Sequence, residues 1–119
     1  MQGDQRLRPS ERLRHPSEYQ CVFECGRRLV TPLFVLYVLP RSEAPSRLGM
    51  AVSKRVGSAV VRNRVKRRIR ELFRQHKSYF ESPCDVVFVA RRQAAEAPLA
   101  EYTRQFLTLL QRQRMSGKK

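Results

Sequence analysis

The stretch VVRNRVKRRIREL (residues 60–72) is both densely charged and regularly apolar. Six of the nine positions from Arg62 to Arg70 are basic. On a helical wheel at about 100° per residue, the apolar positions fall in one arc of about 120°, the width of a normal buried stripe. The pattern therefore predicts a helix that packs on a sheet with one side and presents cations on the other. The stripe consists of Val61, Val65, Ile69, Leu72 and Phe73.

The cations of this segment repel one another. Only Glu71 dilutes them, and like charges three or four residues apart destabilise a free helix by about 0.2–0.5 kcal/mol per pair. The ordinary alternative is a solvated charged face, but such a face usually mixes both signs. The clustering therefore favours an anionic partner.

The whole chain also favours a polyanionic partner. Its 119 residues suffice for one domain, and 25 basic against 10 acidic residues give a net charge of +15. From Arg41 to Lys77, twelve basic residues stand against two acidic ones, a local net charge of +10. This asymmetry favours nucleic acid.

An anionic membrane is the alternative partner for a basic chain. No apolar run approaches the roughly 20 residues of a spanning helix, and the polar N-terminus MQGDQRLRPSERLRHP lacks the apolar segment of a secretory signal. We therefore expect a cytoplasmic protein with no membrane partner.

Apolar runs on both sides of the basic segment predict strands. The run at 31–40, TPLFVLYVLP, is closed by prolines, and 85–91 is a second apolar run. Residues 47–55 alternate, with Leu48, Met50 and Val52 on one face. A short strand at 26–30 would complete a four-stranded sheet.

Three helices accompany these strands. Residues 16–26 have Ser17 as a candidate N-cap, with Gln20 completing a capping box, and Gly26 as a stop. The basic helix starts after Ser58 and extends to about Tyr79, and 96–113 is amphipathic. In the last helix we expect a buried stripe of Leu99, Tyr102, Phe106, Leu109 and Leu110.

The order helix, strands, helix, strand, helix predicts an α+β fold with a single-domain, two-layer sandwich. We expect a flexible basic arm at 1–15, the folded domain at 16–115 and a frayed tail at 116–119. In the first helix, Tyr19 and Phe23 share one side and Val22 lies on another, so that helix has two faces. Plain core packing is the alternative use of the two aromatic rings.

The sequence predicts no catalytic and no metal-binding residue in this chain. There is no Walker loop, no dinucleotide-binding glycine motif, no His-Glu-x-x-His and no nucleophile elbow, and no pair of carboxylates is placed for two-metal chemistry. The remaining candidate ligands are too scattered to favour zinc, and two distant histidines do not make a ribonuclease-type pair. These candidates are Cys21, Cys25, Cys84, His15 and His76.

The segment RLGMAVSKRVGSAVVRNRVKRRIRELFR (47–74) resembles the signature of the bacterial ribonuclease P protein component family. It contains the Arg-x-Gly strand, a Val-Ser-Lys motif, a glycine, the Arg-Asn-Arg motif and a terminal Arg-Glu-x-Phe-Arg. The segments RLRHPSEYQCVFECG, FVLYVL and DVVFVARRQAA match in order and spacing, so the similarity spans about residues 6–110. The departures are Arg55 where Lys is common, Ala51 where Ser or Thr is common, and Arg68 where an apolar residue is usual.

The resemblance implies the fold of the second domain of ribosomal protein S5, with a four-stranded sheet and a left-handed βαβ crossover. Apolar periodicity cannot predict that handedness, and the usual crossover is right-handed.

The resemblance also implies a function, namely removal of the 5′ leader of precursor tRNA by a ribonucleoprotein. The reaction is hydrolysis of one phosphodiester bond that leaves a 5′-phosphate, with the active site and the Mg²⁺ held by the RNA subunit. The expected partners are the catalytic RNA and the leader, with no further protein required. The expected RNA-subunit-binding residues are Arg62, Asn63, Arg64, Lys66, Arg67, Arg70 and Arg74. The expected leader-binding residues are Tyr19, Phe23, Tyr37, Ser53, Lys54 and Arg55.

Two other classes of protein share this composition. A structural RNA-binding protein, such as a ribosomal protein, has the same charge, but the Arg-Asn-Arg helix after a Val-Ser-Lys strand end distinguishes this chain. A DNA-binding regulator would place a short helix before its recognition helix, and none precedes the basic segment. Dense arginine favours phosphate contact over base reading.

Overall fold

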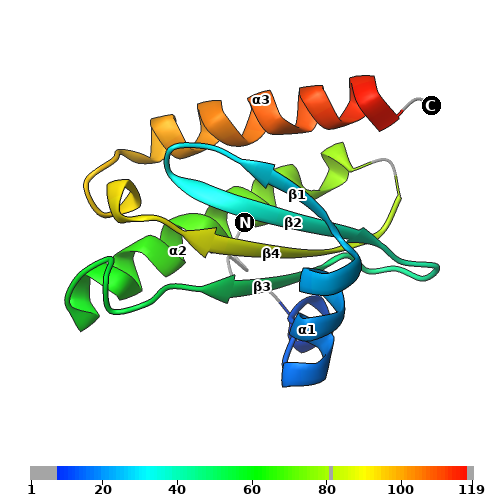
Figure 1. Cartoon of the computed structure of the whole chain (residues 1–119), viewed down its shortest axis with the longest axis horizontal. Helices are drawn as coiled ribbons and strands as arrows, with labels where there is room; N and C mark the ends of the chain where they lie inside the picture. The colour runs from blue at the N-terminus through cyan, green and yellow to red at the C-terminus, as the bar shows by residue number, and fades with distance from the viewer. Residues whose placement is uncertain (1–7, 81, 118–119) are drawn as a thin grey trace, which may run out of the picture.

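The computed structural model describes residues 8–80 and 82–117, which form one four-stranded sheet with helices on both faces (Figure 1). The strand order is β1-β2-β4-β3, with antiparallel pairing of β1 with β2 and of β2 with β4, and parallel pairing of β3 with β4. The strands are β1 (Arg27–Val30), β2 (Phe34–Pro40), β3 (Arg47–Ala51) and β4 (Cys84–Ala90). The helices are α1 (Pro16–Cys25), α2 (Ala59–His76) and α3 (Leu99–Gly117), and short 3-10 turns occupy Pro9–Glu11, Lys77–Tyr79 and Arg92–Ala95.

Alternation along β2 produces two faces. Phe34, Leu36 and Val38 point into the main core, where α2 and α3 pack. Val35 and Tyr37 point to the opposite face, which α1 crosses (Figure 1). Because β2 is central, an apolar run on both of its faces is what this arrangement requires. The expected α+β sandwich is confirmed.

The connection from β3 through α2 to β4 is left-handed. In Figure 1, β3 and β4 both point to the left, β4 lies above β3, and α2 passes behind them. This is the opposite hand to the usual crossover, and it confirms the handedness that the family resemblance implied. It places α2 and α1 on opposite faces of the sheet.

Helix α2 begins and packs as its sequence predicts. The Ser58 hydroxyl accepts a hydrogen bond from the Val61 amide at 3.3 Å, which caps the helix. Val65, Ile69 and Leu72 are fully buried against the sheet, and so is Phe73; Val61 is half-buried. At about 1.5–3 kcal/mol per buried side chain, this stripe fixes the direction in which the cations of α2 point.

Two strands are shorter than the sequence suggested because local turns take over their ends. The Thr31 hydroxyl donates to the Phe34 carbonyl and accepts from the Phe34 amide, so β2 begins at Phe34. After Ala51 the chain turns, and the Val56 amide donates to the Ser53 carbonyl. The Thr31 hydroxyl bonds the backbone and so competes with strand pairing, whereas a backbone hydrogen bond closes the turn after β3.

Helix α1 begins one residue earlier than its expected cap. Pro16 occupies the first turn after His15, and the Glu18 carboxylate accepts from the backbone amides of Arg14 and His15. Ser17 therefore lies inside the helix and does not cap it. Gly26 ends the helix as expected, but in an extended conformation. A Cβ there would lie 2.5 Å from the Val22 carbonyl oxygen, so close packing rather than a left-handed φ requires the glycine.

The packed domain begins before residue 16. The Leu13 amide donates to the Leu48 carbonyl at 2.9 Å, and the Leu13 side chain is 5% exposed. Glu11 is buried and forms an ion pair with Lys77. Of the arm expected at 1–15, residues 8–15 thus lie against the domain, and 1–7 are outside the described residues.

Helix α3 buries most of its expected stripe. Tyr102, Phe106 and Leu109 are fully buried and Leu110 is nearly so, whereas Leu99 is 36% exposed. Leu99 is the first residue of the helix and lies beyond the edge of the core. The prediction that it is buried is wrong.

No helix in the described part of the chain is long and apolar enough to cross a lipid bilayer.

Candidate nucleic-acid interface

The cations of α2 divide into those bound within the protein and those that extend into solvent. Arg64 donates to the Ala95 carbonyl at 3.0 Å, and Arg62 donates to the Gly57 carbonyl at 3.1 Å. Arg74 pairs with Glu71 at 2.7 Å. Each guanidinium has five N–H donors, so these contacts orient the side chains and leave further donors for a ligand.

Arg68 differs from the sequence-based expectation. Its position at the edge of the apolar arc of α2 predicts a stem that lies on the core and a head that reaches solvent. Instead, the guanidinium donates to the Ala97 carbonyl, and its carbon lies 5.9 Å from the centroid of the Tyr102 ring. The residue therefore links α2 to the start of α3.

Lys66, Arg67 and Arg70 make no hydrogen bond or ion pair within the described residues, and Asn63 and Arg67 are exposed. Lys66, Arg67 and Arg70 are therefore the cations of α2 whose charged groups are most available to bind phosphate.

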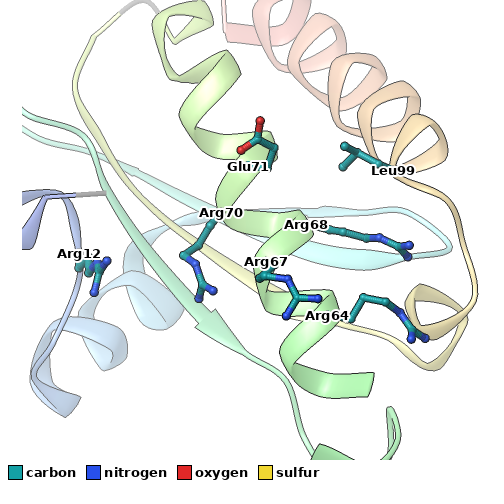
Figure 2. Close-up of a pocket in the computed structure, with 7 residues that line it drawn as sticks. All are labelled: Arg12, Arg64, Arg67, Arg68, Arg70, Glu71 and Leu99. Atoms are coloured by element: carbon teal, nitrogen blue, oxygen red, sulfur yellow. The ribbon is translucent and has the colours of Figure 1, made fainter. Parts of the chain in front are cut away.

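Arginines of α2, some exposed and some half-buried, border a groove of about 550 Å³, which we call the arginine groove (Figure 2). The N-terminal segment contributes one arginine to it from outside α2. The groove is lined by Arg12, Arg64, Arg67, Arg68, Arg70, Glu71 and Leu99.

Arg70 lies close to other positive charges of this groove. Partial burial, and then the positive charges of Arg12 and Arg67, lower the pKa of Arg70. Arg70 remains a cation, but its charged form is less stable than in water. An anion placed among these side chains would offset the repulsion from Arg12 and Arg67.

The opposite face of the sheet carries the aromatic residues. Residues in register share a face, so one row consists of Arg28, Tyr37, Val87 and Gly49, and the next of Val30, Val35, Val89 and Ala51. Helix α1 lies across the first row and leaves the second row only half-buried, with Val30 40% exposed. We call this side of the sheet the α1 face. It thus consists of a row covered by α1 and a half-buried apolar row beside it, which we call the open strip.

Two of the three expected leader-binding aromatics form a pair on this face. The rings of Phe23 and Tyr37 meet edge to face with centroids 4.9 Å apart, and Phe23 is 40% exposed. Arg28 donates to the Tyr37 hydroxyl at 3.3 Å. An exposed aromatic beside a cation can stack on a base and contact its phosphate.

Tyr19 is held more tightly. Its hydroxyl accepts from the Met50 amide at 3.3 Å, and its ring lies against Gly49. It also borders, with Phe23 and neighbouring residues of α1, a surface hollow of about 550 Å³. Tyr19 therefore fixes α1 to β3, and part of its side chain also lines the surface hollow beside Phe23.

Ser53, Lys54 and Arg55 are exposed in the turn after β3. Ser53 lies four positions along the chain from Gly49, which the Tyr19 ring contacts, and two positions beyond the end of β3. The structure does not bring these three residues into contact with the aromatic pair. Ala51 and the open strip lie between the two groups.

An ion-pair network joins α1 to the start of the parallel strands. Arg47 makes a forked contact with Asp85, 2.7 Å at each oxygen, and reaches Glu18 at 3.1 Å. Hydrogen bonding to Asp85 is the main cause that raises the pKa of Arg47. Backbone amides of Arg14 and His15 lower the pKa of Glu18.

Among the described residues, no three His, Cys, Asp or Glu side chains group as metal ligands. A free cysteine is usually a small buried or half-buried residue, and this prediction is wrong for Cys21 and Cys25, which are exposed free thiols. Burial, with a smaller effect of Asp85, raises the pKa of the Cys84 thiol to about 11. Cys84 is therefore a protonated core residue at neutral pH.

Sequence comparison identifies the family. A family model described as Ribonuclease P matches residues 7–114. The chain belongs to the ribonuclease P protein family. Proteins of this family are the subunits that assist ribonuclease P RNA in processing the 5′ leader of tRNA.

Curated relatives cover most of this ribonuclease P family chain. The ribonuclease P protein component of Desulfovibrio desulfuricans is 45% identical over 105 residues, which are 85% of this chain and 81% of that protein. The component of Bacillus cereus is 36% identical over 110 residues, 92% of this chain and 96% of that one.

Solved structures of ribonuclease P proteins have the same fold. The protein from Staphylococcus aureus superposes with a TM-score of 0.75 at 31% identity, covering 85% of this chain and 93% of that one. The protein from Thermotoga maritima gives a TM-score of 0.76 at 30% identity, covering 86% and 96%.

Two features of this ribonuclease P family member escaped prediction from sequence. Gly49 lies under the Tyr19 ring, although an isolated glycine in a strand is a known signal of close approach. Arg12 joins the arginine groove from outside α2, and nothing in its sequence context indicates that position.

We predict that Gly49→Ala destabilises the fold. The added Cβ would lie 2.7 Å from Tyr19 Cε2 and 2.9 Å from Leu13 Cδ1, and overpacking of this kind costs about 1–3 kcal/mol. Thermal unfolding followed by circular dichroism measures the loss. Ser53→Ala, at an exposed position two residues beyond β3, is the control. Equal stability of Gly49→Ala and the wild type would show that α1 does not pack on Gly49.

Proposed function

We propose that this chain binds the catalytic RNA of ribonuclease P through the charged face of α2 and the 5′ leader of precursor tRNA through the α1 face. The observation that carries the proposal is the separation of two surfaces by one sheet. Cations fixed on a packed helix lie on one side, and exposed aromatic and apolar side chains lie on the other.

The charged face suits a folded RNA. Arginine binds phosphate with a planar fork, and each neutralised phosphate releases counterions, which makes binding salt-dependent. The buried stripe of α2 holds the cations in place before the RNA arrives. Little conformational entropy is then lost from the helix on binding.

The α1 face suits a strand of variable sequence. Bases stack on aromatic side chains for about 1–3 kcal/mol each without being read. The exposed edge of Phe23 and the cation of Arg28 supply a stacking surface and a phosphate contact. The turn at Ser53, Lys54 and Arg55 would contact the backbone further along the same face.

The chemical step in this proposal belongs to the RNA subunit, which hydrolyses one phosphodiester bond and leaves a 5′-phosphate on the tRNA. Mg²⁺ would be held mainly by that RNA. The protein would contribute positive charge where two polyanions meet. It would thereby lower the Mg²⁺ concentration that their association requires.

Cleavage of precursor tRNA by the cognate RNA subunit tests the proposal directly. At low Mg²⁺ we expect cleavage with the protein and little without it, because the protein's cations replace part of the screening by Mg²⁺. At high Mg²⁺ the difference should shrink. Absence of stimulation at every Mg²⁺ concentration would overturn the proposed function.

We predict that Arg67→Ala weakens binding to the RNA subunit. Arg67 is exposed and makes no hydrogen bond or ion pair in the described residues, so its loss should remove a phosphate contact without disturbing the fold. The slope of log affinity against log salt should decrease by about one. Arg64→Ala is a less clean variant, because it also removes the contact with Ala95. An unchanged slope for Arg67→Ala would place the RNA elsewhere.

We predict that Phe23→Ala weakens binding of leader-bearing precursor by the holoenzyme by about 1–3 kcal/mol, the value of one stacked base. Binding of mature tRNA should change little. Tyr79→Ala removes another exposed aromatic, from the segment after α2, and serves as the matched control. Equal losses for precursor and mature tRNA would assign Phe23 a purely structural role.

A further inference from the structure

The segment from Arg8 to Leu13, which we call the N-terminal strap, runs along the free edge of β3. Arg12 forms a parallel bridge with Leu48, and the Leu13 amide donates to the Leu48 carbonyl at 2.9 Å. The Leu13 side chain is buried on the α1 side of the sheet. Because β3 is an edge strand, the strap satisfies a backbone group that would otherwise face solvent.

A second contact fastens the strap to the far end of α2. Glu11 is 9% exposed and pairs with the ammonium group of Lys77. The Arg8 amide donates to the other carboxylate oxygen at 2.9 Å. Burial alone would raise the pKa of Glu11, but the hydrogen bonds from Lys77 and Arg8 hold that pKa below its usual value. Glu11 is therefore ionised at neutral pH.

These two attachments bracket Arg12. Its side chain is exposed and makes no hydrogen bond or ion pair within the described residues. It lines the arginine groove with Arg67 and Arg70 (Figure 2). It also lines a second hollow with Lys66 and Arg70. A mobile arginine would move away from these like charges, whereas the strap keeps this one beside them.

Arg14 provides an internal comparison. It is two residues further along, carries the same charge and is exposed, but it does not line the arginine groove. Residues 12 and 14 thus differ in position and not in chemistry.

We infer that Arg12 contacts the ribonuclease P RNA, forming with Arg67 and Arg70 a site for its backbone phosphates, and that the Glu11–Lys77 pair positions Arg12 there. The inference rests on the proposed binding of RNA by the charged face of α2. It adds to that face a residue from a different element, more than 50 positions away in sequence from Arg67 and Arg70.

Arg12→Ala tests the contact, with Arg14→Ala as the matched control. Affinity for the RNA subunit is measured over a series of salt concentrations. We expect Arg12→Ala to weaken binding about tenfold, as for loss of a charged hydrogen bond, and to lower the salt slope by about one. Arg14→Ala should change both quantities much less. Equal effects of the two variants would overturn the inference, because they would reflect net charge alone.

Glu11→Ala tests whether Glu11 positions Arg12, because the positioning role and the change in net charge predict opposite effects on RNA affinity. The variant makes the chain more positive by one charge, so a purely electrostatic effect would tighten RNA binding. If the strap positions Arg12, binding should instead weaken. Unchanged or tighter binding by a folded Glu11→Ala protein would overturn the role of Glu11. Circular dichroism establishes whether the variant is folded.

A double-mutant cycle keeps the inference testable if Glu11→Ala does not fold. Arg12→Ala and Arg70→Ala are combined, and affinity for the RNA is measured. If both side chains bind the same phosphates, their effects are non-additive. Strict additivity would overturn the shared site.

Arg67→Ala separates failure of this inference from failure of the proposed function. If Arg67→Ala weakens RNA binding and Arg12→Ala does not, the α2 interface stands and the role of Arg12 is overturned. If neither variant has an effect, the proposed interface itself fails. If Arg12→Ala affects only precursor tRNA binding to the assembled holoenzyme, the partner is the substrate, and the inference is likewise overturned.

Discussion

The burial of one stripe on α2 is the constraint on which the rest of this structure depends. Val65, Ile69, Leu72 and Phe73 are fully buried, and the opposite side of the same helix carries most of the cations. Because the helix cannot rotate without exposing that stripe, its charges have fixed directions. Mutual repulsion among them is then a standing cost, and an RNA backbone would relieve it.

The left-handed crossover turns this constraint into two separate surfaces. It places α2 behind β3 and β4, on the face of the sheet where α3 also packs, and leaves the other face to α1 (Figure 1). On that face Gly49 allows the Tyr19 ring to approach the strand, and Arg47 ties α1 to Asp85. A docking surface for one RNA and an aromatic surface for another can thus coexist on a small domain without overlapping.

Much of the fold could be predicted from local patterns. The stripe of α2, its Ser58 cap and the apolar runs of β2 and β4 were all visible as periodicity. The errors lie at element ends, where a single side chain decides. Thr31 shortened β2, and Glu18 and Pro16 moved the start of α1. Leu99 has the spacing of a core residue, but it is the first residue of α3 and is 36% exposed, and burial within this helix begins with Tyr102.

The sequence by itself determined the class of partner and the helix that would meet it, because charge density and helical periodicity are local properties. It also determined, through its motifs, the family. Only the tertiary structure decided which cations remain available, because carbonyls of distant residues such as Ala95 and Ala97 engage Arg64 and Arg68. It likewise decided that Arg12 joins the arginine groove. That position depends on the pairing of Arg12 with Leu48 of the edge strand β3 and on the ion pair between Glu11 and Lys77. The sequence around Arg12 predicts neither contact.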